Sequence, residues 1–235
     1  MQKLAVERGW NDRSRILHIG HMGCYASVPA VAMAAKLVSR EDAPASLLFA
    51  EACTLHLKPG AWSDEDVVVN SLFGDGAARV DVSPRAAAGS LALLDSAETI
   101  LPGSGDDMTW SLADSGFHMT LGRAVPGRLR AVVAGFVDDF LARCGLRRAD
   151  VGRFAVHPGG PKIIDDVAAA LGLTPEQVRH SHDVLRERGN MSSSTLPHIW
   201  SRMKEDPAVA AGELIVSLAF GPGLTIVANL LRQEP

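Results

Sequence analysis

The sequence has little of what marks secreted, membrane-spanning or nucleic-acid-binding proteins. Its three cysteines in 235 residues are widely spaced and include no CxxC pair, which excludes a disulfide framework and a cysteine-rich zinc site. No stretch of about 18 uncharged apolar residues occurs, and the chain does not begin with a long apolar run. Basic residues are not in excess, since 23 Lys and Arg stand against 27 Asp and Glu. These absences predict a cytoplasmic protein with reduced thiols that neither spans a membrane nor binds nucleic acid.

The composition supplies enough apolar material for a sizeable core. Hydrophobic residues make up 47% of the chain and charged residues 21%, which is typical of a folded globular protein and not of a disordered one. The length allows either one large domain or two small ones.

Strand and helix patterns alternate along the chain. Short apolar or β-branched runs predict strands, and Ala- and Leu-rich runs with helical spacing predict helices. The predicted strands cover residues 15–19, 46–50, 77–82, 91–94 and 153–156 and two runs between 214 and 231, and the predicted helices cover 29–37, 64–73, 125–146, 162–171 and 175–188. We predict an α/β layered fold of two halves, 1–95 and 96–235, joined by a turn-rich loop at 99–107.

One arrangement occurs twice. A predicted strand leads into a glycine-containing turn that carries a reactive side chain and then into a helix, first at Cys24 and again at His157. Two similar halves that face each other would account for this recurrence, with a functional site at the ends of strands.

Position alone leaves two interpretations open for each candidate. Cys24 precedes a helix, where partial positive charge favours a thiolate nucleophile, but free cysteines are also among the most buried and inert residues. His157 lies in a compact turn, which suits a catalytic role or a structural one. Asn190 follows Gly189 and is by itself an ordinary turn residue.

Five motifs together give a stronger signal. GCYAS, FGDGA, VHPGGP, GNMSS and FGPG occur in the order and approximate spacing of one family. From about residue 15 to residue 231, the chain resembles type III polyketide synthases, the chalcone synthase-like enzymes. Ketoacyl-carrier-protein synthase III enzymes share the Cys/His/Asn set but differ around the histidine and the asparagine, so they rank second.

The resemblance implies a thiolase-like fold, a homodimer and a decarboxylative condensation. A starter acyl group would move from coenzyme A to Cys24 and be extended with malonyl-CoA. Cys24 would be a thiolate paired with a cationic His157. His157 and Asn190 would donate hydrogen bonds to the malonyl thioester oxygen as CO2 leaves. The resemblance implies no metal and no redox cofactor, with acyl-CoA and malonyl-CoA as substrates.

The resemblance also assigns substrate contacts on both sides of the nucleophile. Phe73 matches a phenylalanine that gates the passage from the coenzyme tunnel, although an aromatic core residue is equally compatible with the sequence. A second gating aromatic aligns with Phe117 or, without a gap, with Met119, which would give a softer wall.

His56 falls where the family often has a smaller residue lining the initiation cavity, which suggests a different starter or a smaller cavity. Gly221, Pro222 and Gly223 match a loop that shapes the cavity beside the cysteine, where glycine permits close backbone approach. An ordinary turn between two strands is the alternative for this loop.

The start of the chain departs from the family. Family members carry a substantial portion before the strand that leads to the nucleophile, and it supplies central strands, basic coenzyme contacts and part of the dimer interface. Three explanations remain open: a fragment of a longer protein, a partner chain that supplies the remainder, or a shortened relative with another role. The last two include a non-catalytic acyl-binding subunit.

Overall fold

The computed structural model describes residues 2–10, 12, 14–20, 22–57, 64–113, 116–122 and 124–235. Its helices are α1 (Gln2–Glu7), α2 (Ser27–Glu41), α3 (Asp64–Leu72), α4 (Val125–Arg143), α5 (Pro161–Leu171), α6 (Pro175–Arg188) and α7 (Thr195–Glu205). Short 3-10 helices are η1 (Gly23–Tyr25), η2 (Cys53–His56), η3 (Arg148–Asp150) and η4 (Ser192–Ser194). The strands are β1 (Ala45–Glu51), β2 (Gly76–Val82), β3 (Leu91–Ile100), β4 (Met108–Ala113), β5 (Gly116–Leu121), β6 (Arg153–Val156), β7 (Leu214–Gly221) and β8 (Thr225–Gln233).

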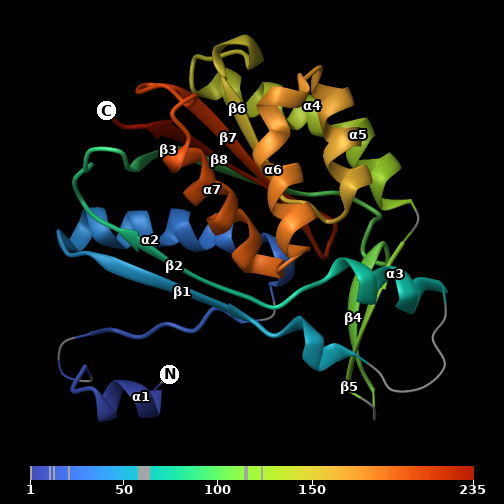
Figure 1. Ribbon diagram of the computed structural model, residues 1–235, viewed down its shortest axis with the longest axis horizontal. Helices are drawn as coiled ribbons and strands as arrows, with labels where there is room; N and C mark the ends of the chain where they lie inside the picture. The colour runs from blue at the N-terminus through green and yellow to red at the C-terminus, as the bar shows by residue number, and fades with distance from the viewer. Residues whose placement is uncertain are drawn as a thin grey trace.

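A four-stranded sheet in the order β3-β8-β7-β6 organises the fold (Figure 1). Strand β6 pairs in parallel with β7, whereas β8 is antiparallel to both of its neighbours. Because β6 and β7 are parallel, their carboxyl ends meet at one edge of the sheet, which is where His157 and Gly221 lie.

Alternation of side chains along β7 separates two cores. Val216 and Leu218 pack with α4 and α5, whereas Ile215 and Ala219 pack with α2 and α7 on the opposite face. The antiparallel β1–β2 ribbon lies beyond α2 and α7 and contributes to the second core. The layers are therefore helices, sheet, helices and ribbon, which confirms the predicted α/β layered architecture.

Helix α6 follows the local sequence signals closely. The Thr174 hydroxyl accepts a hydrogen bond from the backbone N–H of Gln177 at 3.4 Å, and Pro175 occupies the first turn, where no intrahelical donor is needed. Gly189 ends the helix with a positive φ of 74°, a conformation that glycine adopts without strain.

Two predictions of secondary structure are wrong. Residues 15–19 are extended but belong to no strand, because no strand in the described part of the chain pairs with them. Strand β3 continues through Ile100, so the predicted loop at 99–107 begins later, and the boundary proposed at 95/96 falls inside a strand that pairs with β8. The two-half division itself stays a prediction.

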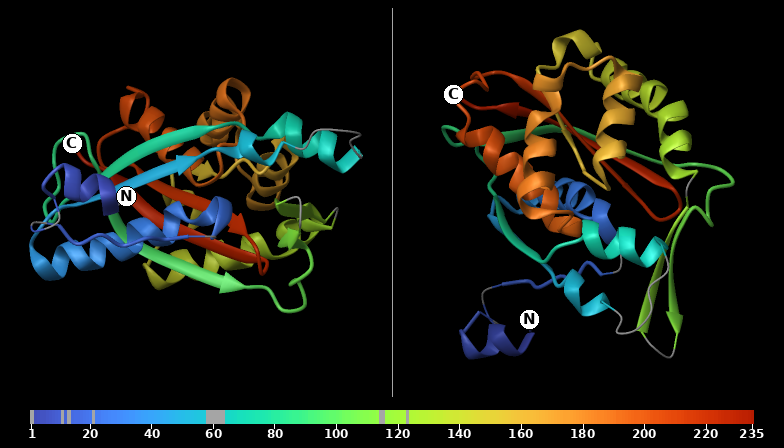
Figure 2. Two further views of the ribbon diagram at one scale, coloured as in Figure 1. Left: turned by 90° about the horizontal axis from the view of Figure 1, so that it is seen from below. Right: turned by 45° about the vertical axis from the view of Figure 1, so that its right-hand side comes forward.

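The sequence pattern does not predict the β4–β5 hairpin. Figure 2 shows it extending away from the four-stranded sheet, where Thr109 and Thr120 share a side-chain hydrogen bond of 2.6 Å across the strands. Among the described residues, no helix combines the length and apolar character needed to cross a membrane.

Candidate active site

Cys24 lies in η1, directly before α2. Gly23 precedes it with a φ of 76°, and the backbone N–H of Ala26 donates to Gly23 O at 3.1 Å. The left-handed conformation at Gly23 closes this turn and directs the chain into the helix.

The loop between β7 and β8 packs against the Cys24 turn. A Cβ atom built on Gly221 would lie only 1.9 Å from Cδ1 of Tyr25, so the tyrosine ring rests directly on the glycine backbone. A Cβ on Gly23 would contact Pro222 Cδ at 3.7 Å. The structure thus brings two residues of the predicted cavity loop, Gly221 and Pro222, next to the nucleophile turn, and Gly223 follows with a φ of 126°.

Asn190 is held between α6 and η4 by backbone pairing with the residues around Phe73. Its N–H donates to Leu72 O at 2.8 Å, and its carbonyl accepts from the N–H of Gly74 at 2.9 Å. These bonds form an isolated parallel bridge between Phe73 and Asn190. Two residues predicted from separate motifs are therefore direct neighbours.

The Asn190 carboxamide oxygen is hydrogen-bonded within the described protein, whereas its nitrogen is not. Its Oδ1 accepts a hydrogen bond from the backbone N–H of Ser192 at 2.9 Å, which fixes the orientation of the carboxamide. Its buried Nδ2 has no hydrogen-bond partner in the described protein, although it lies close enough to Cys24 to lower the pKa of the thiol. A buried donor left free in this way is available to a ligand.

Ser192 is a second donor that the sequence did not identify. It has a φ of 51°, unusual for a residue other than glycine, and its side chain acts as a hydrogen-bond donor that lowers the pKa of Cys24. Its position in the serine run after Asn190 is the only sequence signal for this role.

The protonation state of Cys24 differs from the prediction. Burial raises the pKa of its thiol to about 11, the negative charge of Glu51 adds to the rise, and Ser192 and Asn190 offset only part of it. Burial therefore favours the neutral thiol in the free protein, opposite to the resting thiolate that the resemblance implies.

His157 follows β6 and is buried at 1% exposure. Its backbone N–H donates to Leu218 O at 2.8 Å, and neither ring nitrogen has a partner in the described protein. Burial lowers the pKa of the imidazole to about 3, with no contribution from Cys24. Burial therefore favours the neutral imidazole, opposite to the imidazolium that the resemblance implies.

Glu51 is a charged neighbour that sequence reasoning missed. It ends β1, accepts a hydrogen bond from the backbone N–H of Ser193 at 3.3 Å and a short one from the Ser193 hydroxyl, and raises the pKa values of both Cys24 and Cys53. Burial is the main cause for Cys53, whose pKa rises to about 12. Cys53 therefore lies within electrostatic range of the nucleophile.

The remaining predicted cavity residues lie at η2 and the hairpin. His56 is exposed on η2, and its ring centroid is 5.3 Å from that of Trp110 on β4, tilted by 54°. Met119 on β5 pairs with Trp110 and is half-buried, whereas Phe117 pairs with Leu112 and has a side chain outside the described residues. His56 shares this short helix with Cys53, which interacts electrostatically with Cys24.

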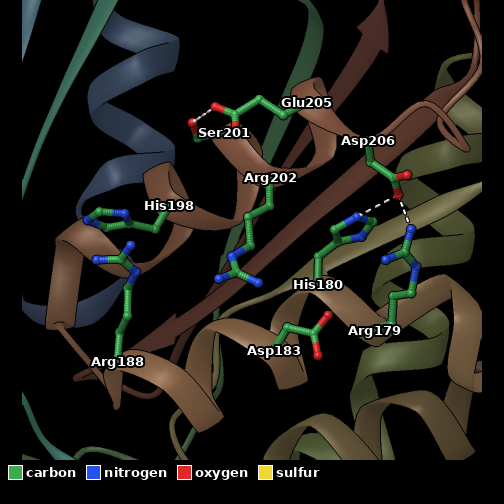
Figure 3. Close-up of a pocket in the computed structure, with 9 residues that line it drawn as sticks. All are labelled: Arg179, His180, Asp183, Arg188, His198, Ser201, Arg202, Glu205 and Asp206. Atoms are coloured by element: carbon green, nitrogen blue, oxygen red, sulfur yellow. Dashed lines mark hydrogen bonds and ion pairs between the residues drawn. The ribbon is translucent and has the colours of Figure 1, made fainter.

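A polar groove of about 520 Å³ separates α6 from α7 (Figure 3). At one end Asp206 accepts hydrogen bonds from Arg179 and lies 2.9 Å from Nε2 of the buried His180. Arg202 of α7 pairs with Glu187 of α6. These contacts connect α6, which precedes Asn190, to α7, which follows it. In the described part of the chain, no three His, Cys, Asp or Glu side chains are grouped to hold a metal ion.

Comparison with known proteins identifies similar sequences and structures. The sequence profile of the chalcone and stilbene synthases, C-terminal domain, matches residues 92–235. The chain is 36% identical to 3,5-dihydroxyphenylacetyl-CoA synthase from Streptomyces toyocaensis, with 90% of this chain and 56% of the relative covered. It is 30% identical to 1,3,6,8-tetrahydroxynaphthalene synthase from Streptomyces griseus, with 92% and 58% covered.

A solved structure agrees with these sequence matches. The crystal structure of 1,3,6,8-tetrahydroxynaphthalene synthase from Streptomyces coelicolor A3(2), a bacterial type III polyketide synthase, superimposes with a TM-score of 0.92 at 26% identity. The match covers 100% of this chain and 67% of that one, and the predicted thiolase-like fold is confirmed. The chain spans just over half the length of the curated relatives it matches.

Proposed function

The chain belongs to the chalcone and stilbene synthase family of type III polyketide synthases, and on that premise we propose that it is an acyltransferase that condenses malonyl-CoA with a Cys24-bound starter. The family match favours this reaction over that of a ketoacyl-carrier-protein synthase III. The observation that carries the proposal is the pair of buried, unpartnered nitrogen groups, Asn190 Nδ2 beside Cys24 and the His157 ring at the same sheet edge.

In the loading step, the Cys24 sulfur attacks the thioester carbonyl of an acyl-CoA. Because both groups are neutral in the free protein, His157 acts as a general base that takes the thiol proton as the C–S bond forms. The proton then passes to the departing coenzyme A sulfur, so that the products are acyl-Cys24 and free coenzyme A.

In the extension step, malonyl-CoA loses its carboxylate as CO2. The electron pair of the broken C–C bond moves onto the thioester, and the Asn190 Nδ2 and a protonated ring nitrogen of His157 donate hydrogen bonds to the developing oxyanion. The enolate carbon then attacks the acyl-Cys24 carbonyl, and the Cys24 sulfur leaves and is reprotonated. This chemistry needs neither a metal nor a redox cofactor.

The same proposal assigns substrate contacts and partners. Phe73, bridged to Asn190, and the loop of Gly221, Pro222 and Gly223 would border the reacting thioester. His56, together with Phe117 or Met119, would border the growing acyl chain. We further propose a homodimer acting in the cytoplasm, where the three cysteines stay reduced, with Cys24 in one half and His157 and Asn190 in the other.

Acyl loading tests the function directly. The purified chain is incubated with acyl-CoA thioesters and its intact mass is measured; we expect one acyl adduct on Cys24, absent in Cys24→Ala and retained in Cys144→Ala. No adduct, or equal adducts in both variants, would overturn the proposal. An adduct that malonyl-CoA does not extend would instead identify an acyl-binding subunit that depends on a partner.

A further inference from the structure

Asp75 of the FGDGA motif makes unusually many contacts for an exposed carboxylate. It accepts hydrogen bonds from the Thr54 backbone N–H at 2.8 Å and from the Thr54 hydroxyl at 2.7 Å. The backbone of Cys53 also contributes, and together these donors lower the pKa of Asp75. Because Cys53 and Thr54 begin η2, Asp75 caps that helix from 21 residues away in the sequence.

The backbone around Asp75 is itself fixed against the Asn190 segment. Gly74 donates its N–H to Asn190 O, and a Cβ built on Gly76 would lie 2.4 Å from Ser194 Oγ, so both neighbours of Asp75 are in close contact with residues 190–194. The Asp75 carboxylate therefore has little freedom to follow η2 if η2 moves.

The strand that leads into η2 is attached to the same segment. Glu51, two residues before Cys53, accepts the hydrogen bonds of Ser193. Residues 51–54, 73–76 and 190–194 thus form a closed ring of contacts beside Cys24. Glu51 pairs with Gly76 across the β1–β2 ribbon, and the Asp75 bonds to Thr54 fix the start of η2 to the same segment.

We propose that Asp75 is a positioning residue: by capping η2 it fixes Cys53 beside the nucleophile site and so determines which acyl groups Cys24 accepts. The effect on acyl-group selection rests on the proposed function. The effect on the position of Cys53 does not depend on it. Loss of the Asp75 bonds would release the start of η2 while leaving Asn190 and the Cys24 turn in place.

Competition between acetyl-CoA and octanoyl-CoA tests the consequence. We expect Asp75→Ala to change the ratio of the two Cys24 loading rates at least threefold, and Asp75→Asn, which keeps one acceptor oxygen, to restore most of the wild-type ratio. Asp81→Ala is the matched control, since Asp81 also accepts two hydrogen bonds, from Ser46 on the neighbouring strand and from Arg79 on its own strand, but does not contact η2. An unchanged ratio in Asp75→Ala would overturn the proposal.

Cysteine labelling tests the structural part without acyl transfer. With iodoacetamide and peptide mass analysis, we expect Asp75→Ala to raise the labelling rate of Cys53 at least threefold and to leave Cys144 unchanged. Asp75→Asn should label Cys53 slowly, because the bond to Thr54 persists although the charge is gone. Unchanged Cys53 labelling, or an equal rise at Cys144, contradicts the proposal. If the wild type loads neither acyl group, the proposed function fails and labelling alone decides the role of Asp75.

Discussion

Replacing Gly221 with alanine should disable the nucleophile turn by steric displacement alone. The added Cβ would lie 1.9 Å from Cδ1 and 2.4 Å from Cε1 of Tyr25, and an ordinary contact begins at 3.4 Å, so the ring must move by about 1.5 Å. Gly221 does not have a positive φ, so the substitution adds no backbone strain of its own. Because Tyr25 follows Cys24 directly and both lie in η1, a shift of this turn that relieves the clash displaces the sulfur as well.

Overpacking of this kind costs about 1–3 kcal/mol of stability. In a chain of this size each kcal/mol lowers Tm by about 2–4 °C. A misplacement of about 1 Å at a reacting atom can reduce rates about 100-fold. We therefore expect Gly221→Ala to fold, to melt several degrees lower and to load acyl groups on Cys24 about 100-fold more slowly.

The assay combines thermal unfolding with the loading rate measured by intact mass. Gly135→Ala in α4 is the control, because nothing lies within 4 Å of its added Cβ; it should leave loading unchanged and raise stability by about 0.5–1 kcal/mol. In the double variant Gly221→Ala with Tyr25→Ala, the clash is gone and part of the lost stability should return. Wild-type loading by Gly221→Ala would refute the reasoning, as would a double variant that is destabilised additively.

Four further outcomes follow from the site. The iodoacetamide labelling rate of Cys24 should rise about tenfold per pH unit from pH 7 to 10, because its pKa is about 11; a plateau below pH 8 would indicate a thiolate. The unfolded state protonates His157 near pH 6.5 and the folded state only near 3, so the free energy of unfolding decreases as the pH is lowered below 6.5. Chemical denaturation should therefore show that, from pH 7 to 5, the wild type loses about 2 kcal/mol more of this free energy than His157→Gln does. Asn190→Ala should slow malonyl-CoA decarboxylation, followed by CO2 release, about 100- to 1000-fold, whereas Cys24 labelling should slow much less because Asn190 offsets only part of the effect of burial on the thiol pKa; equal losses would contradict its role as oxyanion donor. Gly76→Ala, whose Cβ would lie 2.4 Å from Ser194 Oγ, should cost about 1–3 kcal/mol in urea unfolding, and a neutral result would contradict the close packing.

Features set by neighbouring residues could be predicted from the sequence. Helix α6 needs only Thr174, Pro175, Gln177 and Gly189, all within or beside it, and its bounds follow from them. The strand, turn and helix around His157 are likewise local. By contrast, residues 15–19 have strand-like composition but no pairing partner among the described residues, and pairing is not a property of the segment itself.

Properties of the site that depend on burial could not be predicted. The motifs identify Cys24 and His157, but their protonation depends on desolvation by elements distant in the sequence, and this outweighs the helix terminus that favours a thiolate. Asp75 and Glu51 were missed for the same reason, since each acts on a segment far along the chain. Ser192, two residues after Asn190 in the same motif, could have been found from the sequence.

The junction of α6 and α7 makes the reacting carboxamide sensitive to events far from it. The distant end of α6 is fixed by Arg179, which pairs with Asp206, and from Arg179 to Asn190, just past the other end, the chain extends about 17 Å. A tilt of only about 3° about that distant end would swing the tip through about 1 Å, the scale on which reaction rates respond. The ion pair that fixes the start of α6 therefore helps to set the position of the Asn190 carboxamide, although it does not contact that group.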